Sequence, residues 1–340
     1  MSVAIEFPHR LAGHCASGAF RDLLEFRGYR HRGEPLSESM VFGLGAGLDL
    51  LLLTNPGPRT PFYLGGRAPM LEESLMRRIG GSVFRRSETD NDAAWSWVRA
   101  KLDRGEPVAM VGDCQKLEYL KTRTSMPLHV IVATGYDDAH ALIADNDRAE
   151  IQRCSHESLR AARSATGFPL PAMNVTFEIE WPEKIPALDA LVHDAIAEAV
   201  RWFDEPHGPP AAIFGADKFG VAAIDRLETM AREWLESPPA PPAAHAMLLW
   251  IAIAKAGTGG GLFRQLWAGF LREANEVVPS PAMEAARDHY AQLAAEWIAL
   301  GDWCGNGRFD GAAERVLGLV KRERDGLAAL REIRGRFSSL

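Results

Sequence analysis

Residues 129–145 read His129-Val130-Ile131-Val132-Ala133-Thr134-Gly135-Tyr136-Asp137-Asp138-Ala139-His140-Ala141-Leu142-Ile143-Ala144-Asp145. Two short apolar runs joined by Gly-Tyr-Asp-Asp are typical of a β-hairpin. His129 opens the first predicted strand and Asp145 closes the second. Because an antiparallel pair places these two ends side by side, we expect the Asp145 carboxylate to reach the His129 ring.

A residue of complementary chemistry lies far upstream. Cys15 follows Gly13-His14 and begins a helix-compatible run that extends to Leu24. The N-terminus of a helix favours a thiolate, because the helix dipole and free N–H groups lie beside the sulfur. Each of Cys15, His129 and Asp145 alone is more often structural, but together they match a nucleophile, a base and an orienting group. We therefore predict acyl transfer through Cys15, with His129 and Asp145 as the other catalytic residues.

Length and composition indicate a globular protein with two domains. The chain has 340 residues, of which 47% are hydrophobic and 24% charged, as in ordinary globular proteins. The formal net charge of -7 argues against nucleic-acid binding. The strongest apolar run, 48–53, is too short to span a bilayer, and no secretory signal pattern is present. We expect a cytoplasmic protein that binds neither nucleic acid nor membrane.

The cysteines show no metal-binding pattern. Cys15, Cys114, Cys154 and Cys304 lack the spacing of a zinc site or of a disulfide framework. The sequence therefore predicts free thiols and no metal, with only Cys15 in an activating context.

The first half of the chain mixes helices and strands. Apolar periodicity predicts a helix after Cys15 and several further elements. Strands are expected at 107–111, 129–134, 139–145 and 174–180, and short helices at 69–79, 90–103 and 155–165. This segment is predicted to be an α+β domain.

The second half is expected to be all-α. Trp181-Pro182 marks the change, so the predicted domains are 1–182 and 183–340. Ala- and Leu-rich helical runs separated by Pro- or Gly-rich breaks follow, at 187–203, 217–236, 243–256, 261–276, 281–300 and 309–335. The basic stretch from Lys321 to Arg336 is most often a solvated helix face, or else a contact for an acidic partner.

Spaced glycines lie in a block that reads Leu36-Ser37-Glu38-Ser39-Met40-Val41-Phe42-Gly43-Leu44-Gly45-Ala46-Gly47-Leu48. It lacks the Gly-Lys-Ser/Thr of a phosphate loop, so we expect close backbone packing near the active site instead of a nucleotide site.

Together with Gly13-His14-Cys15-Ala16-Ser17 and the segments 107–113 and 129–145, this block resembles the butirosin biosynthesis protein H-like family. The segments 214–234 and 257–274 resemble the helical extension of that family. The resemblance implies a papain-like, cysteine-protease-type N-terminal domain followed by an all-α domain, and it covers nearly the whole chain.

The resemblance also implies an activity. An acyl or aminoacyl group would pass from a carrier-protein thioester to a small-molecule amine through an acyl-enzyme on Cys15, in secondary-metabolite biosynthesis. The expected partner is an acyl carrier protein or another thioester donor. No cofactor is expected on the chain itself, because phosphopantetheine would be carried by the donor. A homodimer is one option for the oligomeric state.

Two positions depart from the pattern of related enzymes. Related peptidases have a glutamine six residues before the cysteine as an oxyanion donor, where this chain has His9. His9 or His14, with the Cys15 N–H, are candidates to replace it. Cys114 follows Asp113 where an apolar or aromatic residue is expected. Ser37, Glu38 and Asp113 are further candidates to line the substrate site.

Two other functions remain open from the sequence. The same machinery would serve a papain-like peptidase or amidase, and a non-catalytic scaffold could retain the fold.

Overall fold

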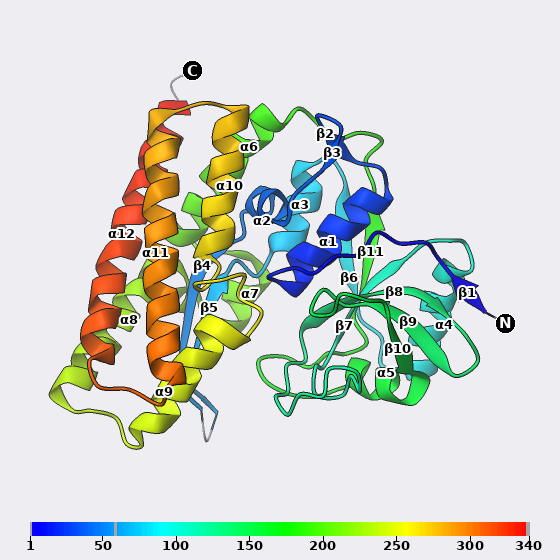
Figure 1. The fold of residues 1–340 in the computed structure, drawn as a ribbon, viewed down its shortest axis with the longest axis horizontal. Helices are drawn as coiled ribbons and strands as arrows, with labels where there is room; N and C mark the ends of the chain where they lie inside the picture. Colours follow the sequence, from blue (N-terminus) through cyan, green and yellow to red (C-terminus); the bar gives the residue numbers. More distant parts are fainter. Residues whose placement is uncertain (1, 58–59, 338–340) are drawn as a thin grey trace. The chain divides into compact units, whose positions relative to one another are not determined.

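The computed structural model describes residues 2–57 and 60–337, which form two compact units (Figure 1). The first unit consists of the residues up to Glu38 together with Gly80–Lys184. The second consists of Ser39–Ile79 together with the residues from Ile185 onward. The chain therefore enters the second unit, returns to the first and enters the second again.

These compact units differ from the expected domains 1–182 and 183–340, which stay a prediction. The last passage between the units, after Lys184, lies close to the predicted boundary. However, residues 39–79, which we expected in the first domain, belong to the second unit. The physical reason is burial, because Leu48, Leu50 and Leu52 lie in the core against helices of the second unit.

The first unit is built on an antiparallel sheet. Its strands follow the order β10-β9-β8-β7-β11-β6, and β1 pairs with β8. The strands are β1 (Val3–Ala4), β6 (Ser82–Arg86), β7 (Val108–Gly112), β8 (His129–Tyr136), β9 (His140–Ala144), β10 (Gln152–Ser155) and β11 (Thr176–Glu180). A small pair, β2 (Arg30–His31) and β3 (Glu34–Pro35), stands apart from this sheet. The four strands predicted from the sequence are confirmed, including the hairpin β8–β9.

Helices α1 (Cys15–Phe26), α4 (Asn91–Leu102) and α5 (His156–Arg163) complete this unit. Met110 and Ile131 are directly opposed in the β7–β8 register and are fully buried. Val98 of α4 and Leu159 of α5 join them in one apolar cluster. This core fixes β8, and with it His129 at the start of that strand.

The second unit contains a β-hairpin and helices. The hairpin pairs β4 (Leu48–Gly57) with β5 (Thr60–Arg67). The helices are α2 (Glu38–Leu44), α3 (Leu71–Arg78), α6 (Leu188–Asp204), α7 (Gly208–Phe214), α8 (Gly220–Glu236), α9 (Pro242–Trp250), α10 (Arg264–Val277), α11 (Pro281–Gly305) and α12 (Ala312–Phe337). A 3-10 turn (Ala216–Lys218) precedes α8, and a π-helical segment (Ile251–Lys255) extends α9.

The described residues from Ile185 onward are helical, as predicted, but the unit as a whole is not all-α because it includes the hairpin. The run Leu50-Leu51-Leu52-Leu53 lacks the polar alternation of a half-exposed strand, which is why the sequence did not show it as one.

The glycine block packs closely, but within the second unit. A side chain at Gly43 would meet the ring of Phe270, and one at Gly45 would meet Leu71. The expectation of close packing is confirmed, whereas its placement in the N-terminal domain is not, because residues 39–79 group with the helices.

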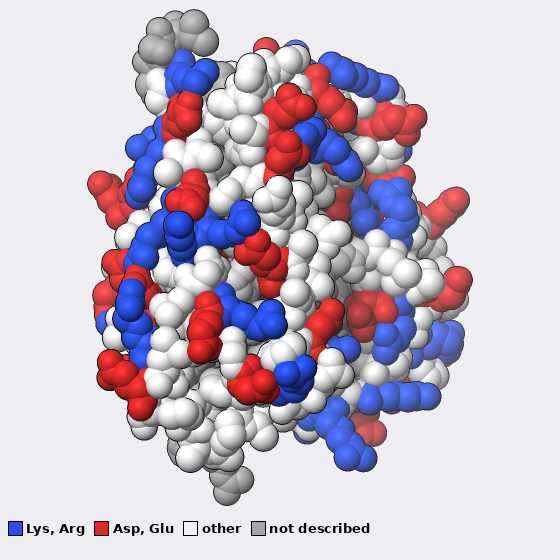
Figure 2. Space-filling view, turned by 60° about the vertical axis from the view of Figure 1, so that its left-hand side comes forward, with Lys and Arg blue, Asp and Glu red and all other residues white. Residues whose placement is uncertain are grey.

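Most arginines near the C-terminus face carboxylates of the same unit. Arg324 lies 2.6 Å from Glu228, Arg322 lies 2.8 Å from Glu296, and Arg331 pairs with Asp204. Figure 2 shows basic and acidic side chains interspersed over the face that is turned forward. These ion pairs support the reading of a solvated helix face over that of a contact for an acidic partner.

Candidate functional site

Helix α1 brings Cys15 to the end of the sheet. Cys15 is the first residue of α1, and Gly18 lies one turn further along. A Cβ atom at Gly18 would come within 2.5 Å of the Ala12 Cβ and 2.8 Å of the Asn146 Cγ. Because glycine has no side chain, α1 can approach the segment that follows β9. Asp145 immediately precedes Asn146 in that segment.

The Cys15 thiol is acidic. Burial by itself would raise its pKa, but interactions with His14 and with His129 outweigh this and hold the pKa well below the usual value. The side chain is partly exposed, so a small reagent can reach it. A lowered pKa favours the thiolate, which is the nucleophilic form of a cysteine. By contrast, burial raises the pKa of Cys154 and of Cys304 to about 11.

His129 and Asp145 form the contact that the hairpin predicts. The Nε2 atom of His129 lies 2.9 Å from Oδ2 of Asp145, and both side chains are buried. Burial alone would lower the His129 pKa, but the Asp145 charge and then Cys114 raise it well above its ordinary value. Although burial opposes ionisation of Asp145, His129 keeps the pKa of this carboxyl below its usual value. The ionised carboxylate accepts the Nε2 proton, so Nδ1 is the nitrogen left for a thiol.

Tyr119 also holds Asp145. Its hydroxyl donates to Oδ2 of Asp145 at 2.9 Å, and the Asp147 N–H donates to Oδ1 at 3.1 Å. Both carboxylate oxygens therefore have partners, which fixes the plane in which Asp145 meets His129. Tyr119 was not expected here, because no sequence pattern links a tyrosine 26 residues upstream to this carboxylate.

Cys114 is a second thiol at the same imidazole. A hydrogen bond between Cys114 and His129 contributes to the raised pKa of the ring. Cys114 is partly exposed, like Cys15. Cys114, the residue that departs from the pattern of related enzymes, therefore lies beside His129.

Glu38 holds the loop that precedes Cys15. Its carboxylate accepts the Gly13 and His14 N–H groups at 2.9 and 2.8 Å, and the Ser17 hydroxyl at 2.9 Å. A carboxylate is favourable at a helix N-terminus. Because these donors occupy its oxygens, Glu38 acts on the shape of the cysteine loop. A part for Glu38 in lining the substrate site stays a prediction.

His14 caps α1 next to the thiol. The Ser17 N–H donates to its Nδ1 atom at 3.2 Å, and His14 also interacts with Cys15. Of the two histidines proposed for the oxyanion site, His9 and His14, it is His14 that contacts Cys15. The Cys15 N–H itself lies in the first turn of the helix, where backbone donors have no intrahelical acceptor.

His9 and Asp113 are placed differently from expectation. The Nε2 atom of His9 lies 2.8 Å from the Arg148 carbonyl oxygen, and Nδ1 lies 3.5 Å from Asp22. Its ring contacts the scaffold through these two residues, and its role as oxyanion donor stays a prediction. Asp113 accepts hydrogen bonds from Gln115, Ser125 and Met126, which shape the loop that carries Cys114.

Ser37 is half-buried directly before Glu38 and stays a prediction. All four cysteines are free. Within residues 2–57 and 60–337, no group of three or more His, Cys, Asp or Glu side chains is arranged to hold a metal ion. Over the same residues, no helix has both the length and the apolar character needed to cross a membrane.

The protein thus belongs to the class of two-unit α+β proteins, and its first unit contains Cys15, His129 and Asp145. Two family models match the chain. The model described as butirosin biosynthesis protein H, N-terminal, matches residues 14–146, which include Cys15, His129 and Asp145. The model described as a domain of unknown function (DUF4872) matches residues 157–330. The chain therefore belongs to the butirosin biosynthesis protein H-like family. No individual curated protein matches it.

Proposed function

We propose that the protein is a cysteine-dependent acyltransferase that moves an acyl or aminoacyl group from a thioester to an amine. The observation that carries the proposal is the acidic Cys15 thiol at the start of α1 next to His129, whose other nitrogen lies 2.9 Å from Asp145. The family supports an acyltransferase-like role in biosynthesis. The natural setting would be the assembly of a secondary metabolite.

In the first half-reaction the Cys15 thiolate attacks the carbonyl carbon of the thioester. A new carbon–sulfur bond forms, and the carbonyl oxygen becomes an oxyanion near the Cys15 N–H. When this intermediate collapses, the donor thiol leaves and takes the proton from the His129 imidazolium. The products are an acylated Cys15, a free donor thiol and a neutral His129.

In the second half-reaction an amine attacks the acyl carbon. Neutral His129 accepts the proton that the amine nitrogen loses. Collapse then expels the Cys15 thiolate and releases an amide. Asp145, held by Tyr119, keeps the His129 ring oriented through both steps and stabilises its protonated form.

We infer that the donor is an acyl carrier protein, or another thioester with a pantetheine arm. In that case phosphopantetheine belongs to the donor, and the chain needs no cofactor of its own. We also propose that the first unit is papain-like. A cysteine at the start of a helix, with histidine and aspartate on an antiparallel sheet, is the arrangement that this fold would require.

The test is to incubate the full chain with an acyl-pantetheine and follow the intact mass. We expect a stable mass adduct that maps to Cys15 and disappears when a primary amine is added, with amide formed in equal amount. Cys15→Ala should give no adduct. His129→Ala should slow adduct formation by about 10²-fold or more, because a general base is lost. Asp145→Asn should leave a larger residual rate, because the imidazole is mis-oriented but present.

The outcomes separate the three candidate functions. Rapid hydrolysis of the thioester without an amine, together with peptide cleavage, would replace the proposal with a peptidase or amidase. Absence of any adduct from a well-folded protein would indicate a scaffold. An unchanged rate in both His129→Ala and Asp145→Asn, with circular dichroism preserved, would refute the catalytic assignment.

A further inference from the structure

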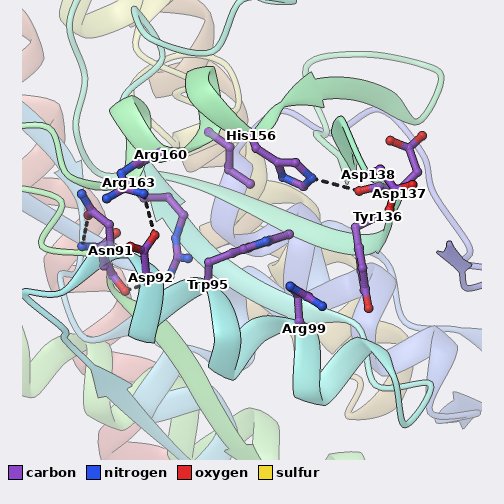
Figure 3. Close-up of a pocket in the computed structure, with 12 residues that line it drawn as sticks. Asn91, Asp92, Trp95, Arg99, Tyr136, Asp137, Asp138, His156, Arg160 and Arg163 are labelled. Atoms are coloured by element: carbon purple, nitrogen blue, oxygen red, sulfur yellow. Dashed lines mark hydrogen bonds and ion pairs between the residues drawn. The ribbon is translucent and has the colours of Figure 1, made fainter. Parts of the chain in front are cut away.

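A cavity of about 360 Å³ lies in the first unit, and none of Cys15, His129 and Asp145 lines it. Its walls come from α4, from the end of β8 with the turn that follows, and from α5 (Figure 3). The volume is in the range of sites that bind small molecules.

Arg163 is the unusual residue in its lining. The side chain is 2% exposed, and its Nη2 atom donates to the Asn174 carbonyl oxygen at 2.9 Å. Its buried Nε atom has no hydrogen-bond partner. Among the described residues, no carboxylate lies within ion-pair distance of this guanidinium. Burial lowers the pKa of Arg163 to about 10, so the group is still charged at neutral pH.

Each of the other buried arginines pairs with a carboxylate. Arg21 pairs with Asp22 at 2.7 Å, and Arg264 pairs with Glu323 at 2.8 Å. Arg78 contacts Asp194 at 2.8 Å and also pairs with Glu198. Because a buried charge without a counter-ion is costly, Arg163 stands out among the four buried arginines of the described residues.

Aromatic rings form the neighbouring wall of the cavity. The ring centroid of Trp95 lies 5.3 Å from that of His156 and 6.1 Å from that of Tyr136. The Nε2 atom of His156 lies 2.9 Å from the Asp137 carbonyl oxygen, so Nε2 carries a proton. Its Nδ1 atom is buried and has no partner. The lining thus combines the inclined rings of Trp95, His156 and Tyr136 with two residues, Arg163 and His156, that each have a buried polar atom without a partner.

The remaining charges of the lining largely balance. Asp92 pairs with Arg160 at 2.6 Å, and Asp137 pairs with Arg153 at 2.6 Å. Arg99 and the exposed Asp138 carry opposite charges. Arg99 is exposed, with its guanidinium 5.1 Å from the centroid of the Tyr136 ring. Arg163 is therefore the buried cation of the lining that lacks a counter-charge.

We propose that this cavity binds a small planar organic anion, whose carboxylate meets the Arg163 guanidinium while its ring lies against Trp95. A carboxylate is the natural complement of a guanidinium with free N–H donors. A planar ring suits the aromatic wall. The site does not depend on Cys15, and its occupation can be measured without any turnover.

The experiment is calorimetric titration of the full chain with 2-naphthoate, with the neutral 2-naphthamide and with inorganic phosphate. We expect saturable binding of the naphthoate with a Kd of about 1 mM or lower. The amide lacks the charge and should bind at least about tenfold more weakly. Phosphate lacks the ring and should also bind more weakly than the naphthoate.

Variants locate the site. Arg163→Met should weaken naphthoate binding by at least about tenfold without lowering Tm, because it removes an unpaired buried charge. Arg163→Lys should bind with intermediate affinity, since the charge remains but the planar fork is lost. The matched control is Arg272→Met, which removes an exposed arginine of the second unit outside the lining and should change the Kd by less than about twofold.

Three outcomes would overturn the proposal: no saturable naphthoate binding, equal affinity for acid and amide, or unchanged affinity in the folded Arg163 variants. Should Arg163→Met not fold, the comparison of acid with amide and the Arg163→Lys variant decide the question. A fall in Tm of Arg163→Met without any loss of binding would assign Arg163 a purely structural role.

Discussion

At the scale of single residues, the pKa shifts of Cys15 and His129 both favour the charged form of the group. The Cys15 pKa is lowered and the His129 pKa is raised, so a thiolate and an imidazolium coexist between the two values. As the pH falls through the lowered Cys15 pKa, the thiolate is lost. As the pH rises through the raised His129 pKa, the imidazolium is lost.

Alkylation kinetics test this pair. The Cys15 rate with iodoacetamide should rise less steeply between about pH 6.5 and 8 than the roughly tenfold per pH unit of an ordinary thiol, because the lowered pKa of Cys15 brings its ionisation to lower pH. His129→Ala should restore part of that ordinary rise, because His14 also lowers the Cys15 pKa. Peptide mapping by mass spectrometry gives each rate. Cys15 should react faster than Cys114, and Cys154 and Cys304 should react slowest. A tenfold rise per pH unit for Cys15 in the native chain would argue against the thiolate.

The sequence allowed part of this site to be predicted. Cys15, His129 and Asp145 could be found because a helix start and a hairpin place them by simple geometry. Tyr119 could not be found, since it reaches Asp145 through a loop whose path depends on tertiary packing. The carboxylates of Glu38 and Asp113 were identified as candidates, but the structure shows them occupied by donors of neighbouring loops.

At the scale of elements, one of the two hairpins was predicted from the sequence and the other was missed. The difference lies in the sequences of their strands. β8 and β9 are short apolar runs joined by recognisable turn residues. β4 contains consecutive leucines, and its pairing with β5 includes register irregularities. An uninterrupted apolar run does not distinguish a strand from a buried helix segment. Tertiary packing against α6 and α8 decides its structure.

Helix α1 depends on close approach at Gly18, which a pair of matched substitutions can test. Gly18→Ala should destabilise the protein by about 1–3 kcal/mol, because the new Cβ would overlap Ala12 and Asn146. It should also slow Cys15 alkylation, since α1 must shift. Gly318→Ala, in open space on α12, should stabilise by up to about 1 kcal/mol through helix propensity.

Chemical denaturation measures both changes in free energy, and Ala12→Gly should partly rescue Gly18→Ala. If Gly18→Ala proved as stable as the parent chain and as reactive at Cys15, close packing of α1 would not be what positions the thiol.

At the scale of the whole molecule, the chain interleaves its two units. The family models meet between residues 146 and 157, whereas the structural units exchange at 38, 79 and 184. The sequence revealed the last of these positions through Trp181-Pro182 and the change to helical runs. It did not reveal the first two, because the segment 39–79 gains its burial from helices more than a hundred residues away.

This interleaving predicts how a shortened chain behaves. A chain of residues 1–184 keeps the segment 39–79 but loses α6, α8 and α10, so Leu48, Leu50 and Phe42 would lose their packing partners. We expect this chain to bind a hydrophobic dye strongly and to aggregate. Replacing 39–79 in it by a flexible linker of about ten residues should reduce both effects, because the exposed leucines are removed. Dye fluorescence and light scattering compare the two chains with the full protein. Equal dye binding by the two shortened chains would contradict the assignment of residues 39–79 to the second unit.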